Sequence, residues 1–273
     1  MFHQRKTRNI FEAVGTTLML IHHQTVYRLR TEHRHAVVGL LMTILQSCLF
    51  IAGFLLFYLI IGTRQSPIRA DFLLFIGSGI FVFMTNTKTC MAVAGSTTIS
   101  SALTRHDPLS PAILVAAAAL QTLYQQVISM VVLLSLYHVL VAPLQIEYPI
   151  GCLAMLIMAW LYGGSVGFVL LGLRPWFPKA SKILTTLYQR INMVASGKMF
   201  VANMIPNILL PYFIWNPLFH LTDQMRGFAF INYTPQKTDP MYALWVTMAV
   251  FMVGLLLNFT TSKYESVSWS AGQ

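Results

Sequence analysis

The sequence predicts an all-α integral membrane protein with six transmembrane helices, an N-terminal amphipathic interface helix and re-entrant helices before the last span. Of its 273 residues, 56% are hydrophobic and 10% are charged, whereas a soluble domain carries about 25% charged residues. Four stretches lack Asp, Glu, Lys and Arg altogether: 35–63, 108–146, 148–173 and 240–262. Each is long enough to cross about 30 Å of hydrocarbon, so the chain is organised around membrane spans.

Two further spans contain polar residues and complete the six. Within a transmembrane domain of residues 36–260, we expect spans at about 36–61, 72–93, 112–141, 150–173, 183–201 and 241–260. The second span is polar around Lys88, and the fifth is interrupted by Gln189, Arg190, Asn192 and Lys198. The fourth holds glycines that permit close approach between helices: Gly163, Gly164, Gly167 and Gly172.

The basic residues indicate how the spans are oriented. With six crossings, the inner loops and ends hold Arg5, Lys6, Arg8, Arg28, Arg30, Arg34, Arg105, Arg174, Lys179, Lys182 and Lys263, and the outer side holds only Arg64, Arg69, Arg226 and Lys237. This bias follows the positive-inside rule and places both termini in the cytoplasm. The net charge of +10 is thereby explained by topology, and no nucleic-acid partner is expected.

The segment before the first span, residues 1–35, should be a cytoplasmic N-terminus that contains an amphipathic helix on the membrane surface. Ile10, Val14, Leu18 and Ile21 recur at helical spacing among basic residues, which is typical of an interfacial helix. A disordered basic tail is the alternative. We expect no cleaved secretory signal, because the first apolar patch is broken by an acidic residue and followed by basic ones.

Two cytoplasmic segments complete the layout. Residues 95–111 are rich in Ser and Thr and contain Arg105, Pro108 and Pro111, which are turn and helix-breaking signals. We expect a loop with a short helix there. Residues 261–273 should form a cytoplasmic tail.

A polar stripe lies in residues 206–233, between the fifth and last spans. The Asn-Pro pair at 216–217 should interrupt a helix, and His220, Asp223 and Arg226 then follow on one helical face. Such a stripe cannot face lipid. Broken backbone at membrane depth is tolerated where protein covers it or where it lines a water-filled cavity, so we expect a re-entrant segment beside a passage.

Three cations lie within or close to the predicted spans. Lys88, Arg190 and Lys198 have no acidic residue in the same spans. A charge in the membrane costs at least about 2.5 kcal/mol and usually faces a cavity or a partner, so these residues are candidates for a path that attracts anions. The alternative is that they extend to the membrane interface, where water solvates them.

The polar stripe has two interpretations. His220, Asp223 and Arg226 could form a proton relay or a catalytic set, but neither an adjacent nucleophile nor a cluster with metal-ligand spacing accompanies them. We therefore interpret them as a structural network.

No cofactor, metal or nucleotide is expected on this chain. Cys48, Cys90 and Cys152 lie in separate apolar stretches and are interpreted as small core residues. The Gly197-Lys198 pair lacks the upstream glycine of a nucleotide-binding loop. Any ATP must therefore be hydrolysed by another chain.

The stretch 215–233, WNPLFHLTDQMRGFAFINY, is similar to the signature WNP-L-x-H-x-x-E-x-x-R of permease subunits in bacterial ABC exporters of capsular polysaccharide, O-antigen and polyol phosphate. The matching residues are Trp215, Asn216, Pro217, Leu218, His220, Arg226 and Tyr233. Asp223 stands where that family usually has Glu. The stretch 103–110 is a looser match to an Arg-x-x-x-Pro segment between the family's second and third spans.

The resemblance implies a half-transporter of the bacterial inner membrane. Two copies would form a passage, pair with two ATPase subunits that bind ATP and Mg, and move a lipid-linked polysaccharide outward; periplasmic or outer-membrane export proteins are further candidate partners. The three cations favour an anionic, capsular polymer. The implied coupling residues are Arg105, His106, Asp107 and Pro108; the gate residues are Trp215, Asn216, Pro217, His220, Asp223, Arg226 and Tyr233; the path residues are Lys88, Arg190 and Lys198.

Two alternative functions stay open at this point. One is an integral membrane enzyme that acts on lipid-linked sugars, with Asp223 or His220 as acid or base. The other is an ABC permease for a hydrophobic drug.

Overall fold

The computed structural model describes residues 10–32, 36–62, 68, 71–96 and 110–270, and every regular element in these ranges is a helix. The elements are α1 (Ile10–Glu32), α2 (Ala36–Ile61), α3 (Phe72–Ala94), α4 (Pro111–Leu140), α5 (Pro149–Leu173), α6 (Pro178–Ala195), the 3-10 helix η2 (Ala202–Met204), α7 (Pro211–Ile214), α8 (Pro217–Ala229) and α9 (Pro240–Ser270). The predicted all-α class is confirmed for these residues.

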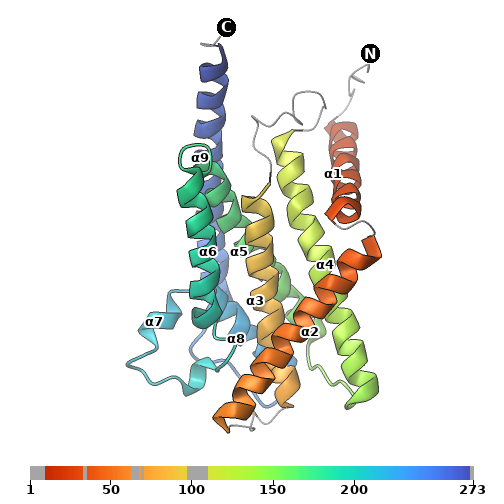
Figure 1. The fold of residues 1–273 in the computed structure, drawn as a ribbon. Coiled ribbons are helices and arrows are strands. Elements are labelled where there is room, and N and C mark those ends of the chain that lie inside the picture. The colour runs from red at the N-terminus through yellow and green to blue at the C-terminus, as the bar shows by residue number, and fades with distance from the viewer. Residues whose placement is uncertain (1–9, 33–35, 63–67, 69–70, 97–109, 271–273) are drawn as a thin grey trace.

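The long helices alternate in direction along one bundle (Figure 1). α2, α4 and α6 run one way, and α3, α5 and α9 return, so α1 and the C-terminal part of α9 lie at the same end. α7 and α8 lie toward the opposite end.

In the described part of the chain, five helices are long and apolar enough to cross a membrane: Val37–Ile60, Phe72–Ala94, Pro111–Leu140, Pro149–Leu173 and Pro240–Lys263. They agree with the first four predicted spans and the last one. The predicted fifth span, 183–201, is not confirmed. In its place, α6 is an amphipathic helix of 18 residues, because polar side chains interrupt its apolar face.

Prolines mark where many of these helices begin. The first residues of α4 to α9 are Pro111, Pro149, Pro178, Pro211, Pro217 and Pro240. A proline in this position loses no helical hydrogen bond, and its backbone angle already suits a helix. At Pro217, the preceding Asn216 caps α8, since its side chain accepts from the backbone N–H of Leu218 at 3.1 Å. The predicted Asn-Pro break is confirmed.

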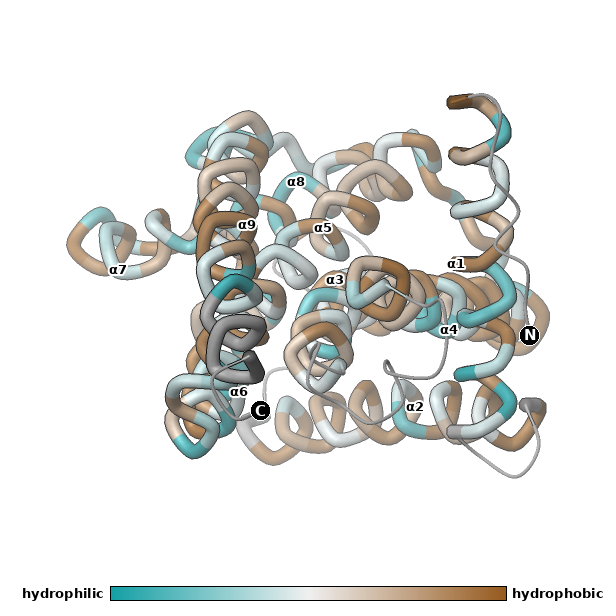
Figure 2. Tube along the Cα trace, turned by 90° about the horizontal axis from the view of Figure 1, so that it is seen from above, coloured by the Kyte–Doolittle hydropathy of each residue, from teal (hydrophilic) through white to brown (hydrophobic). Residues whose placement is uncertain are grey.

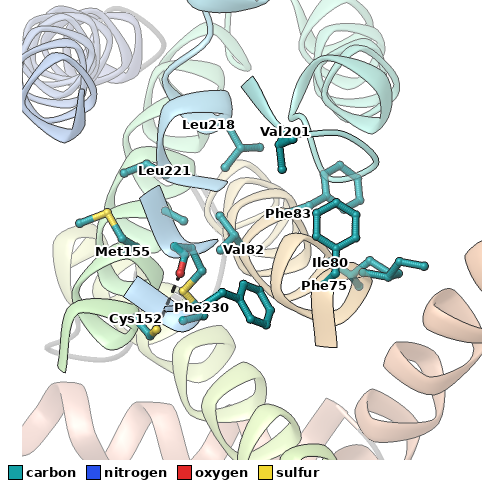
Figure 3. Packing of buried hydrophobic residues seen from close by; sticks show 14 of the residues in the cluster. Phe75, Ile80, Val82, Phe83, Cys152, Met155, Val201, Leu218, Leu221 and Phe230 are labelled. Carbon is teal, nitrogen blue, oxygen red and sulfur yellow. Dashed lines mark hydrogen bonds between the residues drawn. The ribbon is translucent and has the colours of Figure 1, made fainter. Parts of the chain in front are cut away.

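The core is organised around α3, which contacts α2, α4, α5, α6 and α8 and lies among them when the bundle is seen from above (Figure 2). Most of the core residues labelled in Figure 3 come from three helices. They are Phe75, Ile80, Val82 and Phe83 of α3, Cys152 and Met155 of α5, and Leu218 and Leu221 of α8. Cys152 donates to the Met225 carbonyl at 3.8 Å. Cys152 is a free, buried thiol of this core, and Cys90 is a free, buried thiol of a smaller cluster with Ala94 and Leu170. Both are core residues, as predicted, whereas Cys48 is only partly buried.

α3 and α5 touch through glycines. A Cβ added to Gly163 would lie 2.2 Å from the Asn86 carbonyl oxygen, and one added to Gly167 would lie 2.6 Å from that of Cys90. Neither position has room for a larger residue. The predicted close approach is confirmed at these two glycines, and it brings the backbones of α3 and α5 together along one face.

The N-terminal helix packs beside α4. α1 is helical from Ile10, so a disordered tail is wrong for residues 10–32. Its apolar residues Ile10, Phe11, Val14 and Leu18 are exposed, as an interfacial helix requires. The position of this helix on the membrane surface stays a prediction.

Two further predictions concern cytoplasmic segments. Most of the 95–111 loop, with Arg105, His106, Asp107 and Pro108, lies outside the described residues. The expected tail, 261–273, begins as helix, because α9 continues to Ser270 without a helix-breaking residue.

Candidate functional site

Asp223 is a buried carboxylate of α8 that accepts hydrogen bonds from other groups of the protein. Its side chain is 1% exposed. Oδ1 accepts from the backbone N–H of Ala202 at 3.0 Å and from the Tyr233 hydroxyl at 2.6 Å, and Oδ2 accepts from the Thr238 hydroxyl at 2.8 Å. Three donors offset the cost of removing a carboxylate from water. Asp223 thereby ties α8 to the segments on both sides of it.

Arg226 lies one turn further along α8 and is also buried, with 0% exposure. Nη1 donates to the carbonyls of Gly197 at 2.9 Å and Phe200 at 2.6 Å, and Nη2 donates to that of Lys198 at 2.6 Å. Its guanidinium carbon lies 4.1 Å from the centre of the Phe75 ring on α3. The planar guanidinium reaches several carbonyls from one position, which a lysine cannot do.

The room for Arg226 comes from α3. A Cβ added to Gly79 would lie 2.8 Å from both Nη2 of Arg226 and Cα of Lys198. The Coulomb interaction with the Asp223 carboxylate also favours the charged guanidinium. The backbone acceptors and this carboxylate allow a charged guanidinium to be buried at that place.

His220 uses both ring nitrogens to hold backbone. Nδ1 accepts from the backbone N–H of Asp239 at 2.9 Å, and Nε2 lies 2.7 Å from the carbonyl of Ile214. An N–H group can only donate, so Nδ1 is unprotonated and Nε2 carries the proton. The ring also lies 4.7 Å from that of Tyr242. His220 therefore joins α7 and α8 to the start of α9.

A series of polar side chains connects α8 to the middle of the bundle. The Asn216 amide donates to the Asn192 side chain at 2.9 Å, and the Asn192 amide donates to the Tyr188 carbonyl at 3.0 Å. The Tyr188 hydroxyl donates to the Asn86 side chain at 2.8 Å, and the Asn86 amide donates to the Ala159 carbonyl at 3.0 Å. Asn86 and Tyr188 were not among the residues predicted from the sequence. The only feature that could have indicated them is that each is a polar residue near an apolar run.

The other predicted gate residues differ in exposure. Pro217 and Tyr233 are buried, but Trp215 is 57% exposed. The Trp215 indole donates to the Tyr212 carbonyl at 2.6 Å, and the Trp215 carbonyl accepts from the Tyr242 hydroxyl at 2.8 Å. All seven predicted gate residues thus lie in α8 or next to its ends, and their role as a gate stays a prediction.

Two of the predicted path cations line one cleft, which we call the polar cleft. It has a volume of about 980 Å³ and is bordered by α2, α3, α4 and α6. Lys88 is half-buried there and Arg190 is exposed. Uncharged polar side chains lie on the same walls, and apolar side chains form the rest of the lining. The uncharged polar ones are Thr43, Gln46, Thr87, Thr122, Gln125, Thr186 and Gln189. Two cations among hydroxyl and amide groups suit a ligand that is both anionic and rich in hydroxyls.

Lys198, the third cation, lies outside the residues that line this cleft. It is 2% exposed, and its Nζ lies 3.6 Å from the ring centre of Phe83, 4.9 Å from that of Phe54 and 5.3 Å from that of Phe50. Nζ has no hydrogen-bond partner within the described residues. The structure therefore separates Lys198 from Lys88 and Arg190.

No protein-family model matches the chain. Two curated proteins of Escherichia coli, each named polysialic acid transport protein KpsM, are similar to it. The first is 23% identical over 241 residues, which cover 86% of this chain and 90% of the relative. The second is 23% identical over 199 residues, which cover 71% of this chain and 74% of the relative.

These relatives extend the resemblance first seen in residues 215–233 to most of the chain. The recognition from the sequence is confirmed: the chain resembles a capsular polysaccharide ABC permease. The likeness is to a transporter subunit rather than to an enzyme. With the five candidate spans, it supports a multi-pass membrane protein.

Proposed function

We propose that this chain is the transmembrane half of an ATP-driven exporter that moves a lipid-linked, anionic polysaccharide across the bacterial inner membrane. The polar cleft is the observation that carries the substrate assignment, because it combines Lys88 and Arg190 with hydroxyl and amide groups. The relatives are named for the transport of polysialic acid, which is an acidic polymer. Two cations in the lining would not attract an uncharged hydrophobic drug, and placing them in the membrane would still cost free energy.

The proposed assembly contains two copies of the chain and two ATPase subunits, which bind the ATP and Mg. This chain then needs no cofactor of its own. In the bundle, α6 runs parallel to α2 and α4 and antiparallel to α3, α5 and α9 (Figure 1), so we assign it as the sixth crossing. It contributes Thr186, Gln189 and Arg190 to the polar cleft, and its polar residues would therefore face the passage while apolar ones face lipid.

Residues 206–233 are proposed as the outer gate. α7 and α8 lie toward the end of the bundle opposite α1 and the C-terminal part of α9 (Figure 1). If both termini are cytoplasmic, as the basic residues suggest, this end faces the periplasm. The buried Asp223 and Arg226 allow broken backbone to be held at membrane depth, because their hydrogen bonds supply what lipid cannot.

Coupling to the ATPase is assigned to Arg105, His106, Asp107 and Pro108, from the resemblance alone. Reversing the charge of Arg105 and of Asp107 together should uncouple ATP hydrolysis from export. Full export with normal ATPase binding in that variant would remove the coupling role.

The function is tested with the chain and its ATPase partner in proteoliposomes. ATP should drive a fluorescent, lipid-linked acidic oligosaccharide across the membrane, and the substrate should stimulate ATP hydrolysis. If the purified chain alone altered a lipid-linked sugar without ATP, the membrane-enzyme alternative would replace the exporter. Stimulation by hydrophobic drugs and not by lipid-linked glycans would indicate the drug permease.

A further inference from the structure

We propose that the Lys198 ammonium group is a buried anion-binding position, which receives a carboxylate or phosphate group of the passing substrate when the Phe50 and Phe83 rings separate. The inference rests on the proposed export function and deepens it. It assigns a substrate-binding role to Lys198, which does not line the polar cleft.

Lys198 has no counter-charge among the described residues. Lys198 is almost completely buried, yet Nζ finds no hydrogen-bond acceptor in the described residues. The neighbouring charges on α8 do not supply one, because Asp223 is occupied by three donors and Arg226 is itself a cation. Two cations and one acid are therefore buried near the same segment. A buried charge without a partner is costly unless a ligand completes it.

Aromatic rings surround the Lys198 ammonium group. Three phenyl rings lie within 5.3 Å of Nζ, and Phe83 is the nearest at 3.6 Å. Their π faces partly replace water around a cation, so they stabilise Lys198 while the site is empty. An anion would interact with the ammonium far more strongly in such an apolar surrounding than at an exposed site.

Two of these rings also border the polar cleft. Phe50 on α2 and Phe83 on α3 are stacked, with ring centres 5.9 Å apart and planes at 27°. Both rings line the polar cleft, and both also contact Lys198. Lys88 follows Phe83 by five residues on α3, about 7.5 Å along the helix axis. One pair of rings thus borders both the cleft that contains Lys88 and the buried Lys198.

The backbone of Lys198 is hydrogen-bonded to α8. The Lys198 carbonyl accepts a hydrogen bond from Arg226 at 2.6 Å, so the position of the lysine follows any movement of α8. The adjacent Met199 carbonyl accepts from the Tyr58 hydroxyl of α2. A shift of α2 relative to α8 would therefore change two things at once: the position of Nζ among the three phenyl rings, and the contact between the Phe50 and Phe83 rings.

The experiment measures thermal unfolding of the full-length chain in detergent, with and without an anion. The probes are oligogalacturonate, which carries carboxylates only, and dodecyl phosphate, which carries a phosphate only. A ligand that binds the folded state raises its unfolding temperature. We expect at least one probe to stabilise the natural chain, and Lys198→Met to abolish that shift. Lys182→Met, an exposed lysine on α6, is the control and should keep the shift.

The unliganded variants give a second, independent readout. Lys198→Met has similar length and no charge, so it should unfold at the same or a higher temperature than the natural chain. In the reconstituted exporter it should lower transport of the acidic substrate by roughly tenfold, the effect of losing one charge-assisted contact.

The outcomes separate the inference from the proposed function. A response to oligogalacturonate assigns the glycan's own carboxylates, and a response to dodecyl phosphate assigns the phosphate of the lipid linker. An anion-induced shift that persists in Lys198→Met, or that neither probe produces in the natural chain, overturns the inference. If Lys198→Met exports at the natural rate, the inference fails while the exporter stands. If the natural complex moves no polysaccharide, the proposed function fails.

Discussion

Asp223 and Arg226 lie three residues apart on α8 and bind the same preceding segment with opposite polarity. The Asp223 carboxylate accepts from the backbone N–H of Ala202, whereas the Arg226 guanidinium donates to the carbonyls of Gly197, Lys198 and Phe200. Each charged group takes the backbone groups that its own chemistry can use. Residues 197–202 are therefore fastened to α8, and we expect the two to move together.

Replacing Asp223 by Asn should destabilise the chain by about 1–3 kcal/mol, because hydrogen bonds to a charged group are stronger than those to a neutral one. The Asn oxygen can still accept from Ala202 and Tyr233, but the amide nitrogen would require the Thr238 hydroxyl to accept in place of donating. The measurement is the thermal unfolding temperature in detergent. Asp223→Glu, which keeps the carboxylate, should lose less. An unchanged unfolding temperature in Asp223→Asn would show that these bonds contribute little.

Replacing Arg226 by Lys should loosen residues 197–202 although the charge is kept. A single ammonium cannot reach all three carbonyls that the guanidinium now binds, and each hydrogen bond to a charged group contributes about 1.5–3 kcal/mol. Hydrogen exchange of this segment is the measurement, and it should accelerate. The control is Arg174→Lys, because Arg174 donates to the Ser96 carbonyl alone among the described residues. Equal protection in both variants would contradict the expectation.

Some features of the fold follow directly from the sequence. The bounds of the five spanning helices were predictable to within a few residues. Four of them coincide with charge-free runs, which leave little choice in a membrane. The second contains Lys88, but Asp71 marks its start. The helical face shared by His220, Asp223 and Arg226 was also predictable, since it depends only on local periodicity. The length of α6 was not predictable, because polar residues along it make hydropathy ambiguous.

Contacts between distant segments could not be predicted. Asn86 and Tyr188 are 102 residues apart, and they meet only because glycines bring α3 against α5 and α6 packs beside both. From the sequence, Lys88, Arg190 and Lys198 were predicted to line one path, because all three are cations within or close to spans. The structure separates Lys198, since it follows the end of α6 and turns toward Phe50, Phe54 and Phe83.

Replacing Gly163 or Gly167 by Ala should impair folding, because each added Cβ would overlap the backbone of α3. Relieving the overlap requires α3 and α5 to move apart, and overpacking of this kind costs about 1–3 kcal/mol or more. The matched control lies on the same helix. A Cβ on Gly164 would be 3.7 Å from the Thr89 methyl group, an ordinary contact, so Gly164→Ala should behave like the natural chain.

The measurement for the glycine variants is the yield of monodisperse protein after detergent extraction, together with its unfolding temperature. Equal behaviour of Gly163→Ala and Gly164→Ala would mean that α3 and α5 do not approach as closely as the structure shows.

Neutralising Lys88 and Arg190 together should weaken the preference for an acidic substrate. Both line the polar cleft among uncharged hydroxyl and amide groups, so a Lys88→Gln/Arg190→Gln variant keeps hydrogen bonding to sugars and loses only the attraction for anions. Stimulation of the complex's ATPase by an acidic lipid-linked oligosaccharide should fall, whereas stimulation by a neutral one of equal length should change little.

The natural complex should lose its preference for the acidic oligosaccharide as salt is raised, because salt screens charges in a solvent-accessible cleft. Lys182→Gln, an exposed cation on the same helix as Arg190, serves as the control. If the double variant responded to both oligosaccharides as the natural complex does, the two cations would have no part in substrate choice, and the cleft would have to be assigned to another ligand.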